Sequence, residues 1–72
     1  MSFRAYLDDI ETKTGKTADA FLALATEQGF VADGALRPGV KAGQIIDWLK
    51  ADFDLGHGHA MSLVAYFKGR RS

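Results

Sequence analysis

The sequence predicts an all-α fold, a small four-helix domain that spans residues 1–72. Three observations support this prediction. Apolar residues recur at helical spacing in four segments, glycines and hydroxyl residues stand where helices would end and begin, and no useful run alternates apolar and polar residues as a half-buried strand would. A chain of 72 residues supports a single modest core. We expect helices over about residues 3–14, 18–28, 41–53 and 59–68.

Capping residues delimit the first two expected helices. Ser2 is a favourable N-cap, and the apolar stripe that follows it is formed by Phe3, Tyr6, Leu7 and Ile10. Gly15 supplies a left-handed stop, and Thr17 supplies a hydroxyl cap for the second helix. Gly29 is expected to end that helix, with Phe30 folding back as the closing apolar contact.

Turn-forming residues separate this pair of helices from the next pair. Residues 31–39 contain the turn dipeptides Asp33-Gly34 and Pro38-Gly39, so we expect one long loop there. A third helix then carries an apolar face formed by Ile45, Trp48, Leu49 and Phe53. Two closely spaced glycines follow, and we expect them to break the helix and to join it to the fourth through a Gly-His-Gly hairpin.

The expected core combines the inward positions of all four helices. It consists of Leu7, Ile10, Phe21, Leu24, Ile45, Leu49, Leu63, Val64 and Phe67. There is no cysteine, so neither disulfides nor thiolate zinc ligands can reinforce this core. Packing alone must hold the domain together.

Charge and hydropathy limit the classes of partner. The net charge is zero, but residues 1–36 carry three basic and six acidic side chains, whereas residues 37–72 carry six basic and three acidic ones. The second half is therefore the plausible contact for an anionic partner. The longest apolar run, residues 20–25, is too short for a membrane span, and the first residues lack the pattern of an export signal. We expect a cytoplasmic protein with no membrane contact.

The stretch from Trp48 to Ala60 holds the candidate site. It contains two glycines and both histidines of the chain within thirteen positions. The candidate binding residues are Trp48, Gly56, His57, Gly58, His59 and Ser62. Trp48 is more typical of a core anchor than of a ligand contact, although its ring could line the corner that the glycines form.

Metal binding and catalysis are disfavoured at this stretch. Side chains two residues apart on a helix point about 200° away from each other, so a helical backbone cannot aim His57 and His59 at one ion. Ser62 lies three residues after His59, but nucleophilic catalysis also needs an orienting acid, an oxyanion hole and an enclosed pocket. We expect no catalytic residue, no metal, no cofactor and no enzymatic activity.

Two resemblances bear on function. The layout of Leu-Gly-His-Gly from Leu55, with Ser62 where an alanine is usual, resembles the helix-hairpin-helix of non-specific DNA binders. That resemblance implies that backbone amides after Gly56 approach a phosphate. The chain departs from the motif because it lacks a proline in the turn and places Asp52 and Asp54 before the glycines.

The second resemblance covers nearly the whole chain. It rests on Ser-Phe-x-Ala-Tyr-Leu-x-x-Ile-Glu-x-Lys-Thr-Gly-Lys-Thr from Ser2 and on Trp-Leu-Lys-Ala-Asp-Phe-x-Leu-Gly-His-Gly-His-Ala from Trp48. Both motifs are similar to those of a family of small bacterial proteins known only as a domain of unknown function. The resemblance implies an all-helical cytoplasmic domain, sometimes joined to a second uncharacterised domain, and assigns no site residues.

The sequence leaves two functions open. The first is a non-enzymatic binding module that uses the Gly-His-Gly corner and the Trp48 region to hold a protein segment or a small anionic ligand. The second is a weak, sequence-independent nucleic-acid binder that acts through backbone amides and a basic set formed by Lys50, Lys68, Arg70 and Arg71. Nucleic acid is the less favoured partner, because the chain as a whole is not basic.

Overall fold

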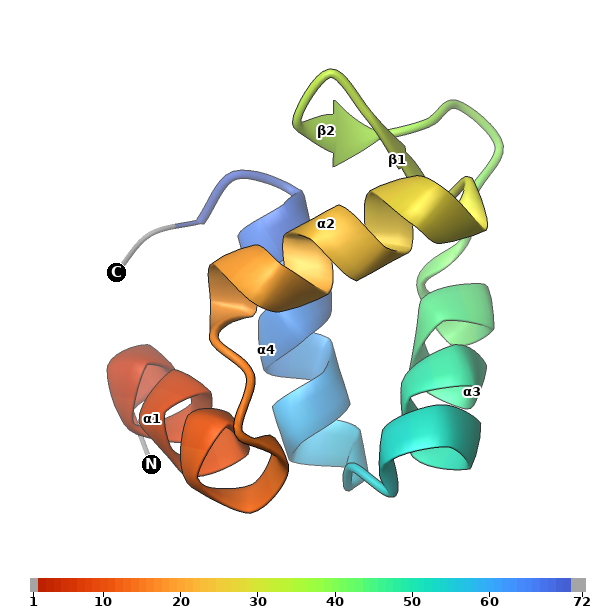
Figure 1. Cartoon of the computed structure of the whole chain (residues 1–72). Helices are drawn as coiled ribbons and strands as arrows, with labels where there is room; N and C mark the ends of the chain where they lie inside the picture. The colour runs from red at the N-terminus through yellow and green to blue at the C-terminus, as the bar shows by residue number, and fades with distance from the viewer. Residues whose placement is uncertain (1, 71–72) are drawn as a thin grey trace.

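The first two helices begin and end where the sequence predicts. The structure, a computed structural model, describes residues 2–70, in which α1 spans Phe3–Thr14 and α2 spans Ala18–Gln28 (Figure 1). The Ser2 and Thr17 hydroxyls accept hydrogen bonds from backbone amides three residues later, both at 3.1 Å. Gly15 and Gly29 end the helices with φ of 75° and 86°, a left-handed conformation that favours a residue without a Cβ.

The connection after α2 is more ordered than the expected loop. It contains a short antiparallel hairpin of β1, Val31–Ala32, and β2, Ala35–Leu36. Asp33 and Gly34 both have positive φ, which matches the tight turn that joins two strands with the natural twist. Strands of two residues are too short to show an alternating pattern, so the turn dipeptide is their only sequence signal.

The last two helices depart slightly from the expected boundaries. Helix α3 spans Ala42–Phe53, with Lys41 as its N-cap, and α4 spans His57–Phe67. Helix α4 therefore starts two residues earlier than expected, and the predicted Gly-His-Gly hairpin is wrong. The joint is formed by Asp54, Leu55 and Gly56, in which the left-handed residue is Asp54 with φ 54°. Asp tolerates this conformation better than most residues, so the turn needs no glycine there.

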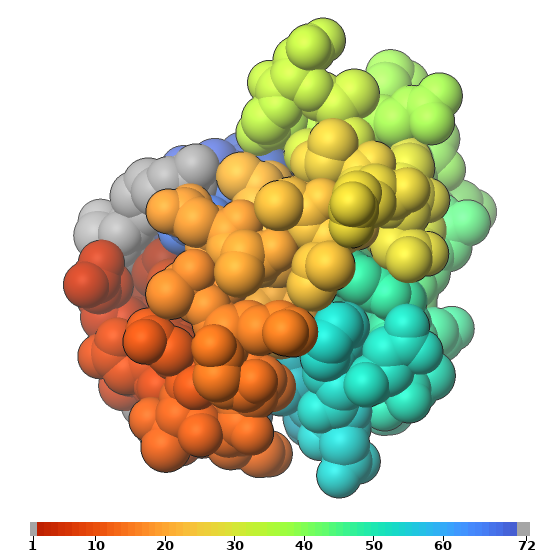
Figure 2. All heavy atoms as spheres, viewed as in Figure 1, coloured from red at the N-terminus to blue at the C-terminus, as the bar shows by residue number. Residues whose placement is uncertain are grey.

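Helix α4 is the centre of the domain. It packs against α1, α2 and α3, and α2 crosses in front of it (Figure 1). In the space-filling view α1 and α2 cover much of the front face, the end of α3 lies at the lower right, and the hairpin projects from the top (Figure 2). No helix in residues 2–70 is long and apolar enough to span a membrane.

Seven of the nine predicted core residues are buried. Leu7 and Leu24 are only partly buried, because they lie at the edge of the packed faces of α1 and α2. The sequence prediction omitted further buried apolar residues, namely Phe3, Ala25, Val31, Ile46, Leu55 and Ala60. Leu55 is buried because the joint between α3 and α4 turns its side chain into the core, which helical periodicity does not reveal.

Candidate functional site

The two glycines of the candidate site belong to the start of α4. Gly56 is the N-cap residue, with φ −71°, and Gly58 is the second helical residue. Neither has positive φ, so neither glycine is required by a left-handed turn. Gly56 supplies no side-chain cap, and the first turn of α4 contains no acidic residue. His57 is exposed at the first helical position.

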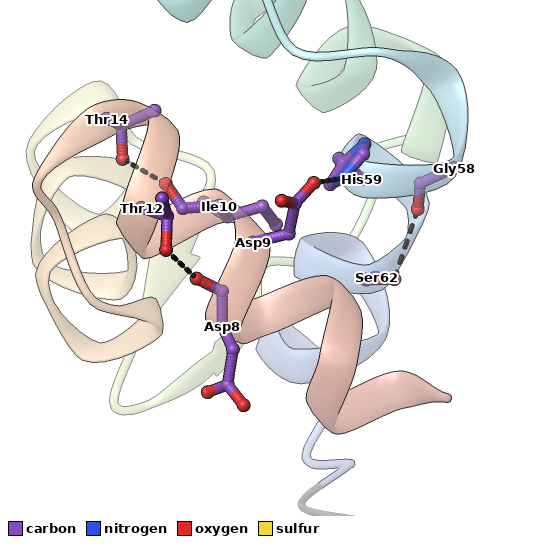
Figure 3. A network of polar contacts seen from close by, with 8 residues as sticks. All are labelled: Asp8, Asp9, Ile10, Thr12, Thr14, Gly58, His59 and Ser62. Carbon is purple, nitrogen blue, oxygen red and sulfur yellow. Dashed lines mark hydrogen bonds and ion pairs between the residues drawn. The ribbon is translucent and has the colours of Figure 1, made fainter. Parts of the chain in front are cut away.

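His59 connects α4 to α1. Its Nε2 atom lies 2.5 Å from Oδ2 of Asp9, and the two side chains point toward each other across the two helices (Figure 3). The imidazole and the Tyr6 ring also form a T-shaped pair, with centroids 5.2 Å apart and ring planes nearly perpendicular. The His59 side chain is only 19% exposed. His59 therefore acts as a bridge between helices and points away from His57.

Gly58 allows Tyr6 to lie directly against α4. A Cβ built at Gly58 would be 3.3 Å from both Cε1 and the hydroxyl oxygen of Tyr6, which is closer than most real Cβ contacts. The corresponding position at Gly56 meets nothing nearer than 3.9 Å. The packing of α1 on α4 thus explains Gly58, whereas Gly56 is needed for neither space nor positive φ.

Ser62 is buried on α4, with its hydroxyl committed to the backbone. The Oγ atom donates a hydrogen bond of 3.1 Å to the carbonyl oxygen of Gly58, one turn earlier (Figure 3). Because the His59 Nε2 atom faces Asp9, the structure does not join Ser62 to the imidazole as a nucleophile would be joined to its base. Within residues 2–70, no three His, Asp or Glu side chains are grouped so that they could hold a metal ion.

Trp48 lies in a separate aromatic cluster. Its ring is 5.6 Å from the Phe30 ring and 5.7 Å from the Phe53 ring, and Phe53 in turn packs edge-on against Phe21. Trp48 is half-buried there and serves as a packing anchor between α3 and the end of α2. The structure thus assigns Trp48 to packing, the role that the sequence favoured for it.

An open groove runs between α1 and α4, and we name it the α1–α4 groove. It encloses about 340 Å³, and its lining residues are Phe3, Tyr6, Gly58, Met61, Ser62, Ala65 and Arg70. Met61 is 42% exposed, and it is the one large hydrophobic side chain that is exposed within residues 2–70. Two of the predicted site residues, Gly58 and Ser62, therefore line the same groove. His57, which directly precedes Gly58 in the sequence, is exposed.

Arg70 closes one end of the groove. Its guanidinium carbon lies 4.5 Å from the centroid of the Phe3 ring. The end of α4 fixes this position, because the amides of Gly69 and Arg70 donate to the carbonyls of Tyr66 and Ala65, as in a Schellman motif. Gly69, with φ 110°, makes the turn that brings the chain back toward α1. Arg71, the last of the predicted basic set, lies outside the described residues.

Sequence reasoning missed most of the groove. Phe3 and Tyr6 belonged to the apolar stripe of the first expected helix, and neither was predicted to be a site residue. The sequence could have placed Met61 outside the core. It falls between the inward positions of α4, and it shares one helix face with His57 and Ala65, which are four residues before and after it. The role of Arg70 depends on the backbone turn at Gly69, which no apolar period indicates.

A second, polar cleft lies on the other side of α1. It encloses about 240 Å³ between α1 and the start of α2, and it includes the acidic residues Asp8, Glu11 and Asp19. The Tyr66 hydroxyl donates a hydrogen bond to the Asp19 carboxylate across this cleft. The acidic side chains Asp8 and Glu11 of α1 thus lie away from the α1–α4 groove.

Comparison with known proteins identifies the family. The model of a family described as a domain of unknown function (DUF4287) matches residues 2–69, and the chain belongs to this family. No curated protein and no solved structure matches the chain significantly.

Proposed function

We propose that this member of the family is a non-enzymatic, cytoplasmic interaction module that holds a short protein segment in the α1–α4 groove, beside the Gly-His-Gly start of α4. The observation that supports the proposal most strongly is the combination of an open groove with an exposed methionine among its lining residues. Methionine side chains are flexible and polarizable, and they are common on surfaces that bind peptides. Water-exposed apolar groups gain most when a partner covers them.

A protein segment fits the lining better than a small anion does. Met61 and Ala65 offer apolar surface, whereas Arg70 is the charged residue among those that line the groove. A dedicated anion site would be expected to gather several donors around one point. The groove instead offers a strip of apolar contact with a charge at one end.

The alternative is sequence-independent nucleic-acid binding at the start of α4. A phosphate there would contact the amides near Gly58, but Lys68 and Arg70 lie at the opposite end of the helix, about 15 Å away by the helical rise per residue. Tyr6 also packs against the Gly58 backbone. Both features favour the protein segment over nucleic acid.

The test is an amide-resolved NMR titration of the folded domain with defined probes. N-acetylphenylalanine amide, a neutral apolar probe, should shift the amides of Tyr6, Met61 and Ala65, because it covers the groove. Inorganic phosphate, zinc and a short DNA duplex should shift them little. Met61→Glu places a charge in the lining of the groove and should abolish the shifts, whereas Asp52→Glu, an exposed change outside the groove, should leave them intact.

The same titration identifies the outcomes that contradict the proposal. Shifts from the apolar probe that are confined to residues around Trp48 would move the binding surface to the aromatic cluster. Shifts from DNA at the amides of residues 57–59, lost steeply between about 50 and 200 mM salt, would establish the nucleic-acid alternative instead.

A further inference from the structure

We infer that the segment held in the α1–α4 groove is helix α4 of a second copy of this chain, so that two copies pair through their grooves about a two-fold axis. This inference rests on the proposed function and names the partner. Each copy supplies both parts of the contact, because Met61 is exposed on α4 and lines an open groove of about 340 Å³. In a two-fold pair, Met61 of each copy meets the groove of the other.

The outer face of α4 presents no charge to a second copy. The helix contains no Asp, Glu, Lys or Arg, although His57, Gly58 and Met61 are exposed. A helix whose outer face meets only water usually has charged residues there. The whole chain has a formal net charge of zero, so two copies approach each other without long-range repulsion. This face therefore suits contact with another protein surface.

Charges of opposite sign stand at the two ends of α4. The exposed Asp54 lies in the joint before the helix, and the exposed Lys68 is its C-cap residue. Met61 is seven residues from each of them. A parallel pair of helices would bring like charges together at both ends. An antiparallel pair centred on Met61 places the Asp54 end of each copy beside the Lys68 end of the other, and these ends are electrostatically complementary.

Lys68 lies on the same side of α4 as Met61. Its backbone stays in the right-handed helical region, with φ −80° and ψ −4°, and residues seven apart on a helix point within about 20° of each other. The helical rise places Lys68 about 10 Å along the axis from Met61. Arg70 is not needed for this pairing, because its guanidinium keeps its contact with the Phe3 ring.

The small contact surface predicts a weak, reversible dimer. Within residues 2–70, each copy offers one large exposed apolar side chain, whereas obligate dimers bury more than about 2,000 Å² of mainly apolar surface. We therefore expect a dissociation constant on the order of 100 µM, typical of a transient contact.

Sedimentation equilibrium of the whole 72-residue chain, from about 10 µM to about 1 mM, measures this association. Met61→Glu places two like charges at the axis and should weaken the dimer at least about 10-fold. Lys68→Glu and Asp54→Lys each replace attraction by repulsion at both ends of the contact, so each should weaken it about fivefold at low salt. Lys16→Glu makes the same charge change at an exposed residue between α1 and α2, and its effect should stay within about twofold.

Mixing the Lys68→Glu and Asp54→Lys variants makes the test specific to contact between copies. In the mixed pair each end again joins an acid to a base, so the affinity should return to within about threefold of that of the unmodified protein. A salt bridge within one chain would not be restored by mixing. Circular dichroism shows whether each variant is folded. If Asp54→Lys does not fold, Asp54→Asn, which tolerates the left-handed backbone, should still weaken the dimer.

The outcomes separate failure of this inference from failure of the proposed function. A dimer that Met61→Glu leaves unchanged, or that mixing of the two folded charge variants does not restore, would overturn the inference. A chain that stays monomeric to about 1 mM, while N-acetylphenylalanine amide still shifts the amides of Met61 and Ala65, would overturn the inference and keep the function. A monomeric chain without those shifts would overturn both.

Discussion

The two sides of α4 are built differently. Toward α2 and α3 the helix presents Leu63, Val64 and Phe67, all at most 1% exposed, in a continuous apolar core. Toward α1 it presents a glycine against a tyrosine ring, a histidine paired with Asp9 and the exposed Met61. One side of the helix is therefore closed by packing, and the other is held by a few specific contacts beside an open groove.

This difference indicates how a very small domain can combine stability with a binding surface. The closed side supplies most of the buried apolar area, which dominates the free energy of folding. The α1 side needs only enough contact to keep α1 in place, so part of its surface remains exposed. Substitutions on the two sides of α4 should accordingly have unequal effects on stability.

The largest expected effect is the loss of a core side chain on the closed side. Phe67→Ala and Leu49→Ala each remove a fully buried side chain and leave a cavity, so each should lower the free energy of unfolding by about 2–5 kcal/mol. Met61→Ala, on the open side of the same helix, should change it by no more than about 0.5 kcal/mol. Urea unfolding followed by circular dichroism measures all three.

Equal losses for Phe67→Ala and Met61→Ala would contradict the comparison. That result would mean that the α1 side is as tightly packed as the core. A melting temperature for Leu49→Ala or Phe67→Ala close to that of the unmodified protein would contradict the four-helix packing itself.

The next effect separates two glycines at equivalent helix positions. Gly58 and Gly43 are both the second residue of a helix, but only Gly58 has a neighbour, the Tyr6 ring, within the space of a Cβ. Gly43→Ala should stabilise the domain by about 0.5 kcal/mol through helix propensity. Gly58→Ala should lower its stability by about 1 kcal/mol, because the Tyr6 ring must move.

Tyr6→Ala provides the control for this pair. In that background Gly58 has lost the close ring, so Gly58→Ala should become stabilising, as Gly43→Ala is. A Gly58→Ala variant that stabilises the domain even with Tyr6 present would show that α1 shifts at no cost, and that Gly58 has another role.

The sequence predicted the scaffold well because helix signals are local. Ser2, Gly15, Thr17 and Gly29 act within a few residues of where they stand, and each caps or ends a helix in the structure. The family resemblance, shown by a match to residues 2–69, pointed to the same all-helical class. The apolar spacing of α3 likewise placed Ile45 and Leu49 in the core.

The candidate site was harder to predict because its contacts are not local. Asp9 and His59 are fifty residues apart, and no spacing rule connects them. The close approach of Tyr6 to Gly58 depends on how α1 crosses α4. A pair of glycines suggested a hairpin between the last two helices, whereas one glycine is an N-cap and the other a packing position.

A smaller effect tests the polar bridge on the open side. The coupling between His59 and Asp9 should be about 0.5–1 kcal/mol, because the pair is only partly buried and water competes for both groups. A double-mutant cycle with Asp9→Ala and His59→Ala measures it. The cycle of Asp9→Ala with His57→Ala is the control, since His57 is exposed at the start of the helix. Equal coupling in the two cycles would show that the bridge contributes nothing specific.

The smallest effect concerns the joint between α3 and α4, where the closed side of the molecule begins. Asp54 adopts φ 54° and ψ 36°, and a left-handed backbone with a Cβ costs energy that glycine avoids. Asp54→Gly should therefore stabilise the domain by a few tenths to about 1 kcal/mol, reduced by the greater freedom of glycine in the unfolded chain. Gly15→Ala is the reverse control, because Gly15 has φ 75° with open space around it, and it should destabilise by about 1 kcal/mol. Thermal unfolding of both variants gives the comparison. A loss of stability in Asp54→Gly as large as that in Gly15→Ala would show that the Asp54 side chain, and not backbone conformation, determines the joint.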